Sequence, residues 1–408
     1  MSERSKAQSW VVNTLLAGNG YEVLHPESRH FLAEIGYDPV DFDRALARVK
    51  TADMMPKAWS EVGQEIQRKA AWYEEQGFTR AARDLYLRAC LLFGHAQYSF
   101  APNDARKAVF RKAVNHCTEK VIALSDYRIE RIEIPFEGRT LYGIAHYPGG
   151  IEAAPLAILL PGMDMYKEDW TKVAAQYYIP RGIAVLAVDG PGQGESFGNG
   201  LLVSAESNYE RAISAFIDHM IAEPEIDAER VGIWGVSMGS YWGLRTAALD
   251  KRVKGVATAM GCYGNMETIF EKAQPGFKAN FMRMTGYTDE SAFDVEVAGR
   301  MGVSQLAGDI ECPVLMAYGE FDELSTLPET LELFERVTAP KRLMVFEQEF
   351  HALGGVGAEL IGSAADWIEA VFAGKLADSH ANQDYIGRDG RIGRGSALPP
   401  WWSNQAAM

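Results

Sequence analysis

The sequence has few cysteines and no long apolar run. Its four cysteines are widely spaced and form no Cys-x-x-Cys pair, which argues against a disulfide framework and against a zinc site. It contains no stretch of 18 uninterrupted apolar residues, so no membrane-spanning helix is predicted. The first ten residues, MSERSKAQSW, lack the apolar segment of a signal peptide. We therefore expect a cytoplasmic protein without a membrane partner or a bound metal ion.

Positive charge is also scarce. Lys and Arg number 40 against 55 Asp and Glu, which gives a formal net charge of −15. Such a surface repels phosphate backbones, so nucleic acid is excluded as a general partner and a small-molecule ligand is expected. The 408 residues are 47% hydrophobic and 23% charged, an ordinary globular composition. This length allows two domains, or one domain with an elaborated cap.

Composition divides the chain into four parts. Apolar residues at three- and four-residue spacing on both sides of Gly77 predict two packed antiparallel helices between Trp59 and Tyr98. No second copy follows at a fixed period, which disfavours a helical solenoid. The predicted parts are a helical N-terminal segment at 1–125, a core at 126–375 with an insertion at about 263–308, and an irregular Gly-rich tail at 376–408.

The core has the pattern of an α/β protein. Two alternating segments, Arg128–Pro135 and Thr140–Tyr147, predict an antiparallel hairpin that turns at Glu137–Gly138. Helical stretches separate most of the later apolar runs, which indicates a mostly parallel, doubly wound sheet covered on both faces. The predicted strands after the hairpin are Leu156–Leu160, Ile183–Val188, Val231–Trp234, Val256–Met260, Val314–Tyr318 and Leu343–Phe346.

A Gly-x-Ser-x-Gly motif occupies Gly235–Gly239, with Ser237 at its centre. The apolar run Val231–Trp234 precedes the motif, and a predicted helix follows from Ser240. A sharp strand-to-helix turn needs small residues on both sides of the serine, and it lifts the hydroxyl to the carboxyl edge of the sheet. The bare motif is common, but in this setting it predicts that Ser237 is a nucleophile.

A serine nucleophile needs a base, and His351 has the expected place in the chain. Of the eight histidines, it alone follows the last predicted strand in a short loop. The other histidines fit ordinary surface or core positions, although His95, in a predicted helix near aromatic residues, could line a pocket.

The base in turn needs an orienting carboxylate, for which Asp322 is the favoured candidate. It lies just beyond the carboxyl end of the next-to-last predicted strand, with Glu320 and Glu323 as rivals in the same loop. The chain order Ser237, Asp322, His351 is that of the α/β-hydrolase fold.

An oxyanion hole requires two backbone N–H groups directed at the developing negative charge. One is expected from Met238, directly after the nucleophile. The other is expected from Met163 in the loop that follows Leu156–Leu160, where Gly162 lets the backbone turn inward.

A glycine-rich stretch, Asp189–Ser196 (DGPGQGES), superficially resembles a phosphate-binding loop. No Lys-Ser or Lys-Thr follows its glycines, and its spacing does not fit Gly-x-Gly-x-x-Gly before a helix. We interpret it as a tight structural loop near the pocket, and no cofactor is predicted.

With these motifs in place, the sequence resembles α/β-hydrolases of the 2,6-dihydroxypseudooxynicotine hydrolase type and, more distantly, fungal polyketide-shortening hydrolases. The resemblance covers about residues 55–375 and rests on Asp189–Ser196, Gly235–Gly239, Gly319–Leu324 (GEFDEL), His351 and the helical N-terminal segment. It implies a helical cap over the site, a homodimer, and hydrolysis of a carbon–carbon bond beside a ketone.

Cleavage of a carbon–carbon bond requires a proton for the departing carbon, or its delocalisation as an enolate. Glu267 lies just past the strand Val256–Met260 and matches an acidic position of the family, so it is the candidate acid; its ordinary alternative is a surface residue in a helix start. Of the cap residues, Trp59, Trp72 or side chains in the region of Phe93 are expected at or near the pocket wall.

Three functions compete. The leading one is cleavage of an acyl–carbon bond in a β-diketone or acyl-phenol type of substrate. The second is a carboxylesterase that uses the same triad and has no need of Glu267. A non-catalytic binding protein is disfavoured, because the predicted triad Ser237, Asp322 and His351 is complete.

Overall fold

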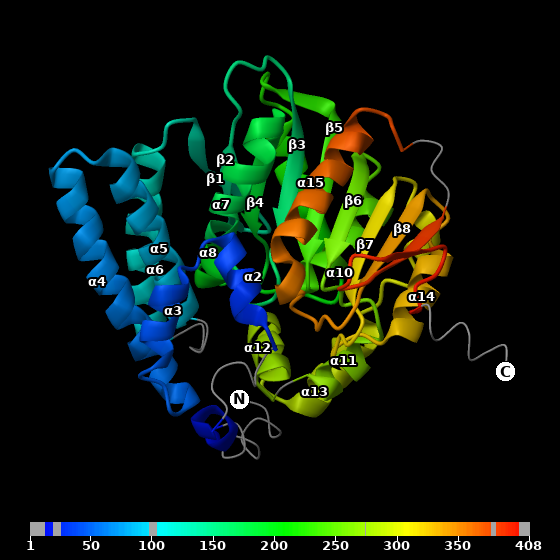
Figure 1. Ribbon diagram of the computed structural model, residues 1–408, viewed down its shortest axis with the longest axis horizontal. Coiled ribbons are helices and arrows are strands. Elements are labelled where there is room, and N and C mark those ends of the chain that lie inside the picture. The colour runs from blue at the N-terminus through cyan, green and yellow to red at the C-terminus, as the bar shows by residue number, and fades with distance from the viewer. Residues whose placement is uncertain (1–12, 19–25, 98–103, 274, 377–380, 400–408) are drawn as a thin grey trace.

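A ten-stranded sheet forms the centre of the computed structural model (Figure 1), which describes residues 13–18, 26–97, 104–273, 275–376 and 381–399. The strand order is β1-β2-β4-β3-β5-β6-β7-β8-β9-β10. Strands β3 to β9 run parallel to one another, whereas β1, β2 and β10 pair antiparallel to their neighbours. The strands are β1 Ile129–Phe136, β2 Arg139–His146, β3 Ala154–Leu160, β4 Ala184–Asp189, β5 Ile226–Val236, β6 Val253–Ala259, β7 Val314–Gly319, β8 Lys341–Phe346, β9 Asn382–Ile386 and β10 Ile392–Arg394.

All eight strands predicted from the sequence are present; three have the predicted length and five are longer, β5 by the most. The first two form the expected hairpin, in which Phe136 pairs with Arg139. Its turn residues have left-handed backbone angles, with φ of 47° at Glu137 and 73° at Gly138. Glycine adopts such angles without steric cost, so Gly138 directs the turn here.

The C-terminal segment differs from the irregular tail expected at 376–408. Residues 382–386 form β9, which pairs parallel with β8, and residues 392–394 return as β10. Only Tyr385 of these two strands is buried. Backbone pairing rather than apolar side chains therefore holds this segment on the sheet, which is why its composition predicted no strand.

Side chains of each central strand alternate between two hydrophobic cores. Leu156, Ile158 and Leu160 of β3 join the core under α9 and α10. Ala157 and Leu159 join the other core, which is shared with α15 and with the helices before residue 125. The N-terminal helices thus pack directly on the sheet layer, and in Figure 1 they stand beside it at one end.

The helices around the sheet fall into two sets. The N-terminal set is α2 Ser28–Ile35, α3 Pro39–Leu46, α4 Met55–Glu75, α5 Thr79–Gln97 and α6 Ala105–Ala123. The others are α7 Thr171–Val173, α8 Gly194–Gly198, α9 Asn208–Met220, α10 Met238–Leu249, α11 Met266–Lys272, α12 Pro275–Thr285, α13 Glu290–Glu296, α14 Leu327–Arg336 and α15 Gly357–Phe372.

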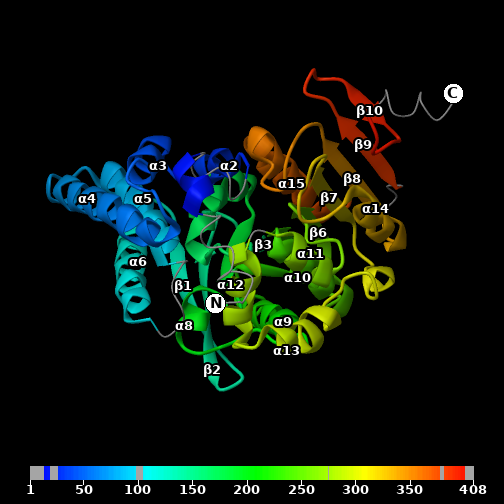
Figure 2. The same ribbon diagram turned by 90° about the horizontal axis from the view of Figure 1, so that it is seen from below.

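The predicted helix pair is confirmed for the described residues: α4 and α5 pack against each other and are separated at Gly77, whose φ is 79°. Tyr98, the predicted end of the pair, lies outside the described residues. The insertion between β6 and β7 contains α11, α12 and α13, which lie close to α10 and α9 when the molecule is viewed from below (Figure 2). In the described part of the chain, no helix combines the length and apolar character needed to cross a membrane.

Candidate active site

Ser237 occupies the turn between β5 and α10, where its backbone is strained. Its φ of 52° and ψ of −122° are unusual for a residue with a side chain, and such a conformation costs on the order of 1–3 kcal/mol. The flanking glycines leave no room for a larger residue. A Cβ atom on Gly235 would lie 2.2 Å from the Gly239 carbonyl oxygen, and one on Gly239 would lie 2.3 Å from that of Leu160. The packing therefore requires the spacing Gly-x-Ser-x-Gly.

Three side chains form a continuous hydrogen-bonded chain at the carboxyl edge of the sheet. Nε2 of His351 lies 3.0 Å from Oγ of Ser237. Nδ1 of the same ring lies 2.9 Å from Oδ2 of Asp322. The other oxygen of Asp322 accepts hydrogen bonds from the backbone of Leu324 and Ser325, which fix the carboxylate in place. The structure thus brings together the three residues that the sequence predicted as a triad.

The charge state of His351 follows from two opposed effects. Burial lowers its pKa, whereas the adjacent Asp322 carboxylate raises it, and the net result is a pKa above the ordinary value. The ring is therefore a stronger base than a buried histidine without a carboxylate.

The two rival carboxylates accept hydrogen bonds from the backbone of the histidine loop, and the charge of Glu323 also helps to raise the pKa of His351. Oε2 of Glu323 accepts a hydrogen bond from the His351 backbone N–H at 2.9 Å. Oε2 of Glu320 accepts one from the backbone of Gln348 at 2.9 Å. Both residues hold the loop that carries His351, and Asp322 alone of the three bonds to its ring.

The loop after β3 approaches the nucleophile as expected for an oxyanion hole. A Cβ atom on Gly162 would lie 3.3 Å from Cβ of Ser237, so glycine allows the close approach. Met163 lines the same cavity as Ser237, and Met238 is the first residue of α10, where backbone N–H groups are not used within the helix. The two predicted donors therefore flank the serine.

The DGPGQGES segment braces this loop. Nε2 of Gln193 donates to the Gly162 carbonyl oxygen at 2.7 Å, and Oε1 of Gln193 accepts from the Tyr209 hydroxyl at 2.6 Å. Asp189 of the same segment binds the buried ammonium of Lys167 at 2.9 Å. These contacts agree with the predicted structural loop near the pocket, and they name Gln193 as a support that the sequence did not reveal.

Gln193→Leu is expected to lower kcat by about 10- to 100-fold, since small misplacements of reacting groups have effects of this size. The change leaves the Gly162 carbonyl oxygen and the Tyr209 hydroxyl without their bonds to Gln193. The melting temperature should fall as well. Steady-state kinetics and thermal unfolding of both proteins test this. An unchanged kcat in a destabilised variant would show that the bond does not position the oxyanion loop.

A small cavity of about 80 Å³ lies over Ser237 and His351. Its walls come from the core and from the two helical parts that flank it. Met163 and Met260 are core residues, Phe31 belongs to α2, and Phe277 belongs to α12. Both the N-terminal segment and the insertion therefore contribute to the cavity wall.

Several polar residues line this cavity besides Ser237 and His351. They include Tyr37, His95, Asp164 and Asp169. The Tyr37 hydroxyl donates to Oδ1 of Asp169 at 3.1 Å, and the backbone N–H of Tyr166 donates to Oδ2 at 2.8 Å. Burial raises the pKa of Asp169 to about 7. His95 lines the cavity as the sequence suggested, and burial lowers its pKa to about 4, so its ring is uncharged at neutral pH.

The candidate acid Glu267 lies away from the cavity, and of the three cap alternatives Trp72 does too. Glu267 is exposed in the first turn of α11, beside Gly299 and outside the cavity wall, because Met266, Ile269 and Phe270 form the buried face of that helix. Trp72 is 53% exposed and contacts Tyr73 instead of the pocket.

Trp59 and Phe93 are both buried, as expected for residues near the wall. Trp59 contacts the cavity residue His95, with 4.4 Å between the ring centroids. The aromatic core of the N-terminal segment thus supports the wall from behind.

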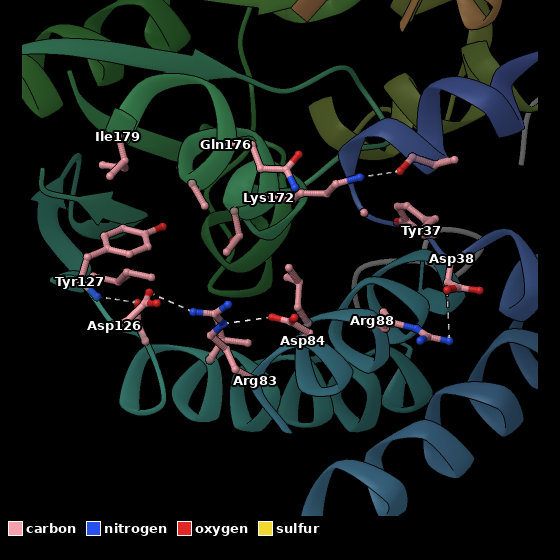
Figure 3. A pocket seen from close by; sticks show the side chains of 18 of the residues that line it. Tyr37, Asp38, Arg83, Asp84, Arg88, Asp126, Tyr127, Lys172, Gln176 and Ile179 are labelled. Atoms are coloured by element: carbon pink, nitrogen blue, oxygen red, sulfur yellow. Dashed lines mark hydrogen bonds and ion pairs between the residues drawn. The ribbon is translucent and has the colours of Figure 1, made fainter. Parts of the chain in front are cut away.

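A larger groove of about 650 Å³ lies outside this cavity, between the N-terminal helices and the core (Figure 3). Its lining includes ion pairs of Arg83 with Asp126 and of Arg88 with Asp38, and a hydrogen bond from Lys172 to the Ala33 carbonyl oxygen. None of the three triad residues lines the groove. Tyr37 is shared by the linings of the groove and the catalytic cavity.

The strand order and the serine turn define an α/β-hydrolase fold. The chain belongs to the FrsA-like esterase family, because residues 54–282 match the family model described as Esterase FrsA-like. Both findings confirm the fold class predicted from the sequence.

Individual relatives agree with this assignment. The chain is 25% identical over 286 residues to Esterase FrsA of Photobacterium profundum, covering 65% of this chain and 64% of that protein. It is 26% identical over 325 residues to 2,6-dihydropseudooxynicotine hydrolase of Paenarthrobacter nicotinovorans, covering 78% of this chain and 84% of that protein. The chain is 31% identical over 246 residues to Hydrolase LUC6 of a Fusarium species, covering 57% of this chain and 58% of that protein. The chain thus spans less than two thirds of Esterase FrsA and of LUC6.

A solved structure shares the fold over most of the chain. The crystal structure of 2,6-dihydroxy-pseudo-oxynicotine hydrolase superposes with a TM-score of 0.76 at 23% identity, covering 86% of this chain and 98% of that one. The coverage includes helical and core parts together.

Proposed function

We propose that the protein is a serine hydrolase that passes an acyl group from its substrate to Ser237 and then to water. The observation that carries the proposal is the chain of hydrogen bonds from Ser237 through His351 to Asp322, with distances of 3.0 and 2.9 Å. Nucleophile and base within hydrogen-bond reach, with the base oriented by a carboxylate, is the arrangement that activates a serine.

In the first half-reaction, Nε2 of His351 takes the proton of the Ser237 hydroxyl while Oγ attacks the substrate carbonyl carbon. The N–H groups of Met163 and Met238 stabilise the negative oxygen that results. The bond to the leaving group then breaks, and the imidazolium returns its proton to that group. Water repeats the sequence on the acyl-enzyme, with His351 again as base, and releases a carboxylic acid.

We propose further that the broken bond joins the carbonyl carbon to another carbon, as in a β-diketone or an acyl-phenol. Support comes from the resemblance described above and from the relative named 2,6-dihydropseudooxynicotine hydrolase, which aligns with 78% of the chain. Since Glu267 lies outside the cavity, the imidazolium of His351 is the proton donor to the leaving carbon in this proposal.

Carboxylic ester hydrolysis is the second candidate, favoured by the match of residues 54–282 to an esterase family. The same triad can serve this reaction. An alkoxide leaves more easily than a carbanion, so an ester requires no additional acid.

Rates on an aryl β-diketone and on an aryl ester of the same acyl group distinguish the two candidates. Carbon–carbon hydrolysis predicts that the wild-type protein converts the diketone to a carboxylic acid and a ketone. Ester hydrolysis without any diketone turnover would establish the esterase instead. Glu267→Gln should leave both rates unchanged. A lower rate on the diketone alone would show that Glu267 takes part in carbon–carbon cleavage. The homodimer and the cytoplasmic location stay predictions.

A further inference from the structure

Asp164 lines the catalytic cavity, and its carboxylate has no bonding partner among the described residues. The residue directly follows Met163 in the oxyanion loop and lines the cavity together with Ser237 and His351. It is half-buried, and its carboxylate forms no hydrogen bond or ion pair with any residue that the structure describes. Nearby Asp169 differs, since Tyr37 and Tyr166 both donate to it.

No residue of the cavity wall supplies a positive charge to balance Asp164. Among the described lining residues there is no lysine or arginine. The charge of Asp164 acts on both His95 and His351 and raises the pKa of each, so the carboxylate lies within electrostatic range of both rings. Burial nevertheless keeps His95 uncharged at neutral pH, and Asp322 is already the carboxylate partner of His351.

An unbalanced carboxylate is unfavourable where an oxyanion must form. Two negative charges that share a small cavity inside a protein repel each other more strongly than in bulk water, because the effective dielectric constant is lower. A substrate that carries a positive charge removes this repulsion and gives the carboxylate a charge-assisted hydrogen bond. A substrate that itself carries a carboxylate would add to the repulsion.

From this geometry we infer that Asp164 is a specificity-determining residue that binds a protonated amine of the substrate. The inference deepens the proposed hydrolase function and depends on it only for the role of the cavity as the substrate site. It predicts that the protein selects cationic ketones or esters over neutral ones of the same shape, and that it rejects anionic ones.

Binding to three small methyl ketones tests the inference without requiring turnover. Each has two methylenes between the ketone and a terminal group, which is dimethylamino, isopropyl or carboxylate. We expect the wild-type protein to bind the dimethylamino ketone about tenfold or more tightly than its isopropyl counterpart by titration calorimetry, as a charge-assisted hydrogen bond allows. The carboxylate ketone should bind most weakly.

Variants assign the preference to one side chain. In Asp164→Asn the ratio of the dimethylamino to the isopropyl affinity should approach one, whereas Asp164→Glu, which keeps the charge, should retain a preference. Glu267→Gln removes a carboxylate outside the cavity and is the matched control, so its ratio should equal that of the wild type.

Three results would overturn the inference. They are equal binding of the amine and its neutral counterpart by the wild type, an unchanged ratio in Asp164→Asn, and an equal loss of the ratio in Glu267→Gln. The first needs no variant, so the test holds even when Asp164→Asn does not fold. Full hydrolysis by Ser237→Ala would refute the proposed mechanism while leaving these binding ratios interpretable.

Discussion

Ser237→Ala is expected to lower kcat on the order of 10³-fold or more on every substrate, because the covalent route is lost when the nucleophile is removed. The fold should be unaffected, since the hydroxyl bonds to the side chains of His351 and Cys262 and to no backbone group in the described part of the chain. Stopped-assay kinetics and thermal unfolding of the two proteins measure both effects.

An organophosphonate should label Ser237 of the wild type and nothing in the variant. Ser204→Ala is the matched control, because Ser204 is an exposed serine remote from the triad in the chain. Labelling of another residue, or full activity in Ser237→Ala, would remove Ser237 from the mechanism.

Asp322→Asn should lower kcat by about 10⁴-fold, the loss seen when an orienting carboxylate becomes an amide in a serine triad. The amide no longer fixes the ring tautomer in which Nε2 accepts the serine proton. The substitution also changes how activity depends on pH. Catalysis needs neutral His351, so activity is lost as pH falls through the pKa of His351, which Asp322 raises above the ordinary 6.5.

The acid limb of kcat/KM in the wild type should therefore lie above pH 6.5. Without the carboxylate, burial is the main remaining influence and lowers the pKa, so the residual activity of Asp322→Asn should persist to lower pH. Glu359→Gln, an exposed change on α15, should alter neither the rate nor the limb. An acid limb that stays in place would mean that another group titrates.

The three catalytic candidates were predictable because their signals are local. Ser237 needs two glycines and a strand before it, and Asp322 and His351 each follow a short apolar run. Parallel strands end at one edge of a sheet, so residues that follow different strands meet there. The alternating and apolar runs likewise predicted all eight strands of the core hairpin and parallel sheet.

Side-chain direction on a helix was harder to obtain. Glu267 was placed correctly after β6, but the helix that begins at its N-cap Asn265 turns Met266, Ile269 and Phe270 inward. Glu267 therefore points outward. The apolar residues of this short helix are three and four positions apart, so their common face was already visible in the sequence.

Cavity residues contributed by distant segments could not be predicted at all. Tyr37 and Asp169 are 132 residues apart and meet only because α2 packs against the core. Asp164 is next to a predicted oxyanion donor, yet its lack of a partner is a property of the folded molecule alone.

The C-terminal hairpin has a consequence for how the molecule behaves among its own copies. Without β9, the hydrogen-bonding edge of β8 would face solvent as an open, parallel-paired strand, a template on which other chains can add and aggregate. With β9 and β10 in place, the outermost strand has only three residues and carries Arg394, so it offers little to a second chain. Removal of residues 382–394 should therefore shift the protein from a dispersed state towards insoluble assemblies.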